Sequence, residues 1–172
     1  FYRALSQGKS RAVALQQAVQ ASPVIRSDET SETSARVDGR NWWQWVFVGW
    51  DAVVHVIRPS RGEDVITEIM GPARVLAWVS DCWAPQLRAP AETHQLCLSH
   101  QIRNLQGLIE RAPRLHWARQ MQALFREAIH LAKRRDEMTE RGFQRRTTQI
   151  ERRLAGLIDR SVTNPLAQPL LK

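Results

Sequence analysis

The spacing of hydrophobic and polar residues differs between three stretches of the chain, and these differences predict three structural regions. Residues 5–20 are rich in Ala, Gln and Leu and predict a helix that ends before Ser22-Pro23. Short β-branched and aromatic runs follow, separated by turn residues, which is typical of strands. Helical spacing then returns. We therefore expect a helical lead-in (residues 1–21), a sheet-containing core (22–95) and a helical region (96–172).

Four strands are expected in the core, because β-branched and aromatic residues cluster in four short runs. In the second run apolar residues lie on both alternating faces, as in a strand that is covered on both sides. Asp38-Gly39, just before it, is a hairpin signal. The runs occupy residues 24–28 (with 34–37 as a candidate extension), 41–48, 52–57 and 75–80.

One helix is expected between the third and fourth runs. Ser60 and Glu63 have capping-box spacing, apolar residues follow at helical spacing, and Gly71-Pro72 closes the helix. Tight turns predict an antiparallel meander of the first three strands, and the helical crossover predicts a parallel fourth strand beside the first. The expected fold class is α/β, an RNase H-like mixed sheet followed by an all-helical insertion.

Charge is concentrated in the helical region, where helices are expected at residues 96–110, 113–131 and 140–160. The net charge is +8, and residues 101–172 carry fifteen basic and seven acidic side chains, so the whole excess lies there. A basic face of this kind attracts nucleic acid; the alternative is a solvated, Arg-rich helix surface. The candidates for contact with the DNA backbone are Arg134, Arg135, Arg145, Arg146, Arg152 and Arg153.

Two other features of composition narrow the class of protein. No run of 18 apolar residues occurs, so no membrane span is expected. The two cysteines, Cys82 and Cys97, make no disulfide framework, which fits a reducing cytosol.

Asp28 and Asp81 are the candidate catalytic residues, because each closes an apolar strand with the sequence Ser-Asp. If the two strands are parallel neighbours, both carboxylates emerge at one edge of the sheet, on strands about 4.8 Å apart. Such a pair suits Mg²⁺ or Mn²⁺, and two such ions support phosphoryl transfer. The alternative is that each Asp only caps a turn.

Several separate motifs in the chain resemble those of the insertion sequence 66 type of bacterial transposases. They lie between about residues 22 and 110, in one order along the chain. The matching segments are Val24-Ile25-Arg26-Ser27-Asp28-Glu29-Thr30, Ser34-Ala35-Arg36-Val37-Asp38-Gly39-Arg40-Asn41-Trp42-Trp43-Gln44-Trp45-Val46-Phe47, Pro59-Ser60-Arg61-Gly62, Val79-Ser80-Asp81-Cys82-Trp83 and His94-Gln95-Leu96-Cys97-Leu98-Ser99-His100.

The resemblance implies a DDE active site that cleaves DNA and transfers strands, with Asp28 as the first acid and Asp81 as the second. It implies two Mg²⁺ or Mn²⁺ ions, DNA as the partner, a homo-oligomeric intact enzyme, and a bacterial cytoplasmic location at the nucleoid. The third acid, a Glu in an Asn-Asn-x-x-Glu-Arg-like segment, is not found, and Glu137, Glu140 and Glu151 stand in a different context. We therefore expect a central catalytic piece, cut at both ends and inactive alone.

Two departures from the family pattern affect this expectation. Ser31-Glu32-Thr33 nearly repeats the segment before it, and an insertion within a strand reverses the facing of later residues unless it loops out. The family signature Cys-x-x-His-x-x-Arg-Asp is matched by Cys97, His100 and Arg103, but Asn104 replaces the Asp.

The remaining polar candidates have more than one interpretation. Cys97, His100 and Arg103 would support the active site or hold DNA; alternatively Cys97 packs in the core, or His94, Cys97 and His100 bind zinc. Arg61 would approach a phosphate or lie at a solvated helix start. For the whole chain, the rivals to a transposase are another RNase H-like nuclease and a decayed, non-catalytic remnant that binds DNA.

Overall fold

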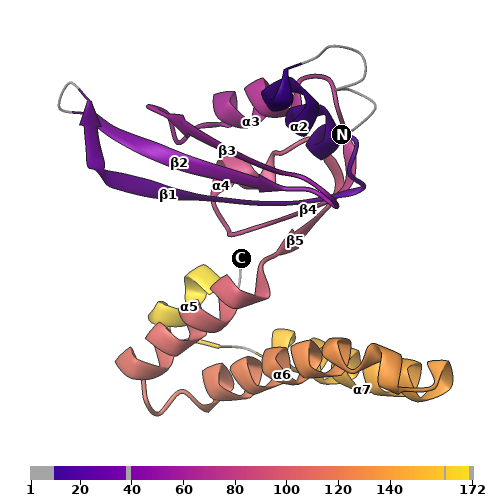
Figure 1. Cartoon of the computed structure of the whole chain (residues 1–172). Coiled ribbons are helices and arrows are strands. Elements are labelled where there is room, and N and C mark those ends of the chain that lie inside the picture. Colours follow the sequence, from indigo (N-terminus) through magenta and orange to yellow (C-terminus); the bar gives the residue numbers. More distant parts are fainter. Residues whose placement is uncertain (1–9, 38–39, 161, 171–172) are drawn as a thin grey trace. The chain divides into compact units, whose positions relative to one another are not determined.

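The computed structural model describes residues 10–37, 40–160 and 162–170, and the chain forms two compact units that meet between Cys97 and Leu98. Residues 5–9 of the expected first helix and the expected Asp38-Gly39 turn lie outside the described residues. Figure 1 shows the first unit as a sheet with helices and the second as helices only.

A five-stranded mixed sheet forms the first unit, in the order β3-β2-β1-β4-β5. β1 pairs antiparallel with β2 and β2 with β3, whereas β4 lies parallel to both β1 and β5. The predicted meander and the parallel fourth strand beside the first are therefore confirmed. The strands are β1 (Val24–Val37), β2 (Arg40–Val48), β3 (Val53–Arg58), β4 (Val75–Ser80) and β5 (Ala91–Leu96).

The irregularity expected from the Ser-Glu-Thr repeat lies beyond Asp28. The β1–β2 register is continuous from Arg26, opposite Val48, to Glu32, opposite Trp42, and shifts only between Glu32 and Val37. Asp28 pairs with Val46 inside the regular part of the register. Its side chain therefore follows the same alternation between the two faces of β1 as the apolar residues before it. The Ser-Glu-Thr repeat therefore does not change which face of β1 carries Asp28.

One face of the sheet carries α2 (Arg11–Gln20), α3 (Glu63–Met70) and the short α4 (Ala84–Leu87). Apolar residues of α2 and α3 pack there against inward-facing aromatic residues of the strands. Trp45 and Phe47 stack with ring centroids 5.9 Å apart, and Trp78 meets Phe47 edge-on at 6.1 Å. All three are fully buried and form the centre of the core.

Three local predictions in this unit are wrong. α3 begins after Gly62, not Ser60, because the Ser60 hydroxyl accepts from the Gly62 N–H and donates to Asp64 instead of forming a capping box. α4 and β5 lie between residues 80 and 97, where no helix or strand was predicted. β5 has no apolar pattern, since only Ala91 of its six residues is buried, and it is held by backbone pairing to β4.

Helices alone make up the second unit. An amphipathic face of α5 (Leu98–Arg111), α6 (His116–Lys133) and α7 (Glu140–Ile158) encloses a core that includes Leu108, Leu124 and Leu157. The buried Trp117 indole donates to the Leu157 carbonyl at 2.9 Å and joins α6 to α7. Short 3-10 helices at Arg135–Glu137 and Pro165–Leu170 complete it, and the three predicted helices are confirmed to within a few residues at their ends.

Among the described residues, no helix combines the length and the apolar character that a bilayer crossing demands.

Candidate functional site

Asp28 lies within β1, and Asp81 directly follows the neighbouring parallel strand β4. In the β1–β4 ladder Ile25 faces Trp78 and Arg26 faces Val79, an offset of 53 residues. The same offset separates Asp28 from Asp81, so the two acids would be opposite each other if this register continued two residues past the last paired position. Neighbouring strands lie about 4.8 Å apart, which brings both backbones within reach of one ion.

The two carboxylates are half-buried and each is tied to nearby backbone. Asp28 Oδ1 accepts from the Glu29 N–H at 3.1 Å, and Asp81 Oδ1 accepts from the Trp83 N–H at 2.9 Å. Along β1, the buried Ser27 and Glu29 alternate with Asp28, so Asp28 faces away from the helix-covered core. Among the described residues, no third His, Cys, Asp or Glu completes a metal-binding group with them.

Arg61, a candidate for phosphate contact, forms an ion pair with Glu29, and 34% of its side chain is exposed. Its Nη2 and Nε each lie 2.9 Å from Glu29 Oε1, and the Glu29 side chain is fully buried. Burial raises the pKa of the Glu29 carboxyl above its ordinary value, although the hydrogen bonds from Gln86 and Arg61 act in the opposite direction. The Asp81 charge also acts to raise this pKa.

Sequence reasoning missed Glu29 and Gln86 as members of the site. Gln86 Nε2 donates to Glu29 Oε2 at 2.6 Å from a helix that was not predicted. The available signal was the strand period of two, since Glu29 lies on the same face as Ile25 and must enter the core.

The Cys-x-x-His signature divides between the two units. The Cys97 N–H donates to the Ser80 carbonyl at 2.6 Å, so Cys97 lies beside the end of β4 and is half-buried. His100 and Arg103 lie on α5, where His100 is half-buried and Arg103 exposed. His94 Nε2 contacts the Ala89 carbonyl, and within the described residues no zinc-binding group forms.

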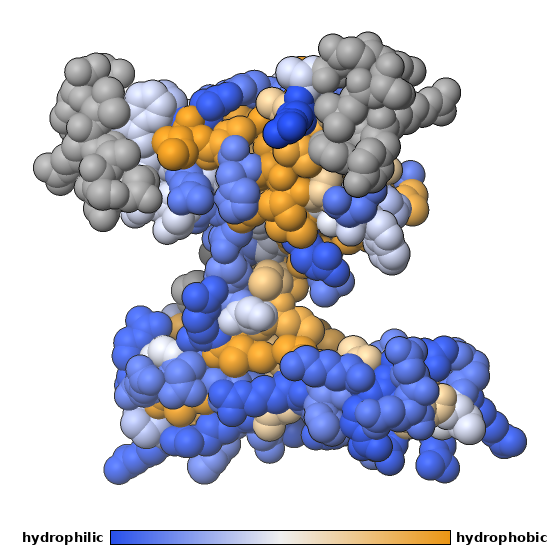
Figure 2. Space-filling view, viewed as in Figure 1, coloured by the Kyte–Doolittle hydropathy of each residue, from blue (hydrophilic) through white to orange (hydrophobic). Residues whose placement is uncertain are grey.

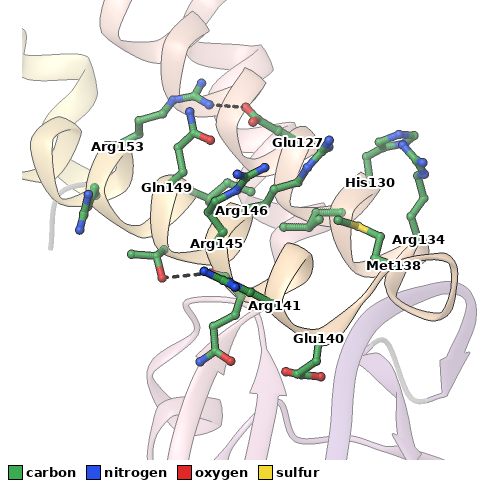
Figure 3. Close-up of a pocket in the computed structure, with 15 residues that line it drawn as sticks. Glu127, His130, Arg134, Met138, Glu140, Arg141, Arg145, Arg146, Gln149 and Arg153 are labelled. Atoms are coloured by element: carbon green, nitrogen blue, oxygen red, sulfur yellow. Dashed lines mark hydrogen bonds and ion pairs between the residues drawn. The ribbon is translucent and has the colours of Figure 1, made fainter.

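A basic groove lies between α6 and α7 in the helical unit (Figure 3). Its volume is about 1300 Å³, and none of its lining residues belongs to the sheet unit. Five of the six arginines proposed for DNA contact line it or its rim, all of them exposed. They are Arg134, Arg145, Arg146, Arg152 and Arg153.

These arginines differ in whether a carboxylate already neutralises them. Arg134 pairs with Glu137 at 2.9 Å, and Arg153 with Glu127 at 2.6 Å. The sixth candidate, Arg135, pairs with Glu140 and packs over the Phe143 ring. The other three form no ion pair within the described part of the chain, so no carboxylate there neutralises their charge and a polyanion could do so. They are Arg145, Arg146 and Arg152. The face shown in Figure 2 is correspondingly hydrophilic over most of α6 and α7.

Comparison with known protein families identifies the chain as a transposase. Residues 5–171 match the family described as "Transposase IS66 family". Because the match covers nearly the whole chain, the chain belongs to the IS66 family of transposases. No curated protein matches the chain.

Proposed function

We propose that the sheet unit is the RNase H-like catalytic core of a DDE transposase, which cleaves DNA and joins the freed strand to a target. One observation carries the proposal, namely the parallel β1–β4 pairing that ends with Arg26 opposite Val79, two residues before Asp28 within β1 and two residues before Asp81 just after β4. The strand order and the α3 crossover between β3 and β4 support it. Family membership favours a transposase over a resolvase or an exonuclease.

Asp28 and Asp81 would hold Mg²⁺ or Mn²⁺, because carboxylate oxygens are the hard ligands that these ions prefer. When bound, such ions neutralise charge that develops on the reacting phosphate. In the intact enzyme water would cleave a phosphodiester at the transposon end and release a 3′-hydroxyl group. That hydroxyl would then attack a phosphodiester of the target DNA and displace its 3′-oxygen.

The helical unit would bind the DNA backbone through the basic groove. The intact enzyme would be a homo-oligomer and would act at the nucleoid. Arg145, Arg146 and Arg152 are the strongest candidates, because no carboxylate among the described residues neutralises them. Cys97 would support the active site through its contact with the end of β4. His100 and Arg103 would contribute to DNA binding from α5.

The proposal predicts metal binding without cleavage by this chain alone, because no third acidic ligand joins the pair in the described residues. Mn²⁺ titration followed by electron paramagnetic resonance should show binding that Asp28→Asn and Asp81→Asn each weaken by at least about tenfold. Duplex DNA incubated with the chain and Mn²⁺ should remain intact. Cleavage that disappears in the Asp81→Asn variant would show that the chain is active alone.

A second candidate function is DNA binding without catalysis, as in a decayed transposase. The basic groove and the two-carboxylate set favour it. DNA binding that depends on salt but not on Mn²⁺, with no loss of Mn²⁺ binding in Asp28→Asn, would support this candidate against the first.

A further inference from the structure

The buried carboxylate of Glu29 forms polar contacts with two neighbouring side chains, Arg61 and Gln86. Its Oε1 accepts two bonds from Arg61 and its Oε2 accepts one from Gln86, so both oxygens are occupied. It lies on the face of β1 opposite to Asp28. Glu29 therefore points to the core side of β1 and Asp28 to the other side, although the two carboxylates are adjacent in sequence.

Gln86 is fully buried and its amide has one consistent orientation. The Trp78 indole N–H, which can only donate, points at Gln86 Oε1 at 2.9 Å. The Gln86 amino group must then face Glu29 Oε2 and the Ser27 hydroxyl at 3.3 Å. The Gln86 amino group therefore requires a hydrogen-bond acceptor at position 29, and it holds Glu29 Oε2 against the core.

Arg61 connects Glu29 to the segment that carries Asp81. Its guanidinium carbon lies 4.7 Å from the centre of the Trp43 ring and 4.2 Å from that of Trp83. The Trp83 indole N–H donates to the Arg61 carbonyl at 3.2 Å, and the Trp83 backbone N–H donates to Asp81 Oδ1 at 2.9 Å. Continuous contacts thus run from the Gln86 amide, through Glu29, Arg61 and Trp83, to Asp81.

We propose that Glu29 and Arg61 are positioning residues, which hold Trp83 and thereby keep the Asp81 carboxylate in register with Asp28. The proposal rests on the proposed metal site at the two aspartates. Asp81 follows the last residue of β4, so its carboxylate needs support from outside the strand. The Glu29 and Asp81 carboxylates repel each other, and Arg61 compensates that repulsion while its planar group stacks on the indole.

Arg61→Lys tests the proposal, because lysine keeps the charge but loses the two-nitrogen contact with Glu29 and the stacking on Trp83. The matched control is Arg58→Lys, in another Arg–Glu pair of the same unit, where Arg58 Nε donates to Glu68 at 2.9 Å on the surface. Glu29→Gln is the second test variant, and thermal unfolding checks that each variant folds. All proteins are the full 172-residue chain labelled with 5-fluorotryptophan.

Two readouts separate the positioning role from the metal site. We expect Arg61→Lys and Glu29→Gln to move or broaden the Trp83 fluorine resonance, which Trp83→Phe identifies, and to weaken Mn²⁺ binding roughly tenfold, as loss of a supporting contact at a metal site does. Arg58→Lys should change neither. Unaltered Mn²⁺ affinity in both test variants, with binding that still depends on Asp81, would overturn the positioning role.

Failure of the metal site itself would be visible separately. If Mn²⁺ binding survives Asp28→Asn and Asp81→Asn, the proposed function is wrong. The Trp83 fluorine resonance then tests the claim that Glu29 and Arg61 hold Trp83 in place. A shifted resonance in folded Arg61→Lys and Glu29→Gln would support this claim, and an unchanged resonance would overturn it.

Discussion

The glutamates of two arginine–glutamate pairs in the sheet unit have pKa values shifted in opposite directions. Burial raises the pKa of Glu29 despite its bonds to Gln86 and Arg61, whereas the hydrogen bond from Arg58 lowers the pKa of Glu68 on the surface. The Glu29 side chain is 0% exposed and the Glu68 side chain 48% exposed. Desolvation therefore outweighs the paired charge at Glu29, and the charge prevails where water remains.

The opposite shifts predict opposite pH dependence of stability. A carboxyl whose pKa is raised on folding adds stability below its unfolded value of 4.5, and this is lost as the pH rises through the folded pKa. The free energy of unfolding of the wild type minus that of Glu29→Gln should thus increase as the pH falls toward 4.5 and below. Urea unfolding at a series of pH values measures it.

Glu68→Gln is the control with the reverse sign. Its lowered pKa adds stability above 4.5 that is lost as the pH falls through the folded value, and exposure limits the effect to about 0.2–1 kcal/mol. The wild type minus Glu68→Gln difference should decrease with falling pH. The same trend for both variants would contradict the assigned causes.

At the scale of elements, the sequence predicts those strands and helices whose apolar residues follow one period. Residues 41–48 and 75–80 carry buried Trp45, Phe47 and Trp78, so their strands were evident. The parallel pairing of β1 with β4 was also predicted, from the helical crossover between the third and fourth strands. β5 could not be predicted, because backbone pairing holds it and five of its six side chains face solvent.

The contacts around Glu29 could not be predicted for a related reason. Arg61 and Gln86 lie 32 and 57 residues away from Glu29, and polar partners leave no periodic signal. The position of Gln86 depends on α4, a helix of four residues that includes Pro85. Only the burial of position 29 could be inferred, from the alternation of β1.

The α5–α6–α7 unit has a core of its own, so a change there tests these elements. Leu108 is fully buried in this core, and Leu108→Ala should lower the free energy of unfolding by about 2–5 kcal/mol. Ile158, 58% exposed on α7, is the control, and Ile158→Ala should change it by less than about 1 kcal/mol. Urea unfolding followed by circular dichroism measures both, and equal losses would contradict the core assignment.

For the whole molecule, the uneven charge predicts where DNA binds. Arg145 and Arg152 are two helical turns apart on α7, about 10.5 Å along its axis, and form no ion pair among the described residues. If each contacts a phosphate, the double variant Arg145→Ala, Arg152→Ala should reduce the slope of log affinity against log salt by about 1.8. Fluorescence anisotropy with labelled duplex DNA measures the slope.

Arg74→Ala is the matched control for this charge loss, because Arg74 is exposed on the sheet unit and outside the groove. Its slope should stay close to that of the wild type. An equal reduction for Arg74→Ala and for a single α7 variant would indicate that net charge alone, and not the α7 arginines, determines binding.

A shared metal site requires the carboxylates of Asp28 and Asp81 to lie together, and a crystal structure of the chain soaked in Mn²⁺ tests this pairing most directly. We predict carboxylates about 4–6 Å apart with a metal between them, as phosphoryl transfer by metal ions requires. Carboxylates more than about 10 Å apart, or on opposite faces of the sheet, would contradict the shared site and favour a DNA-binding remnant.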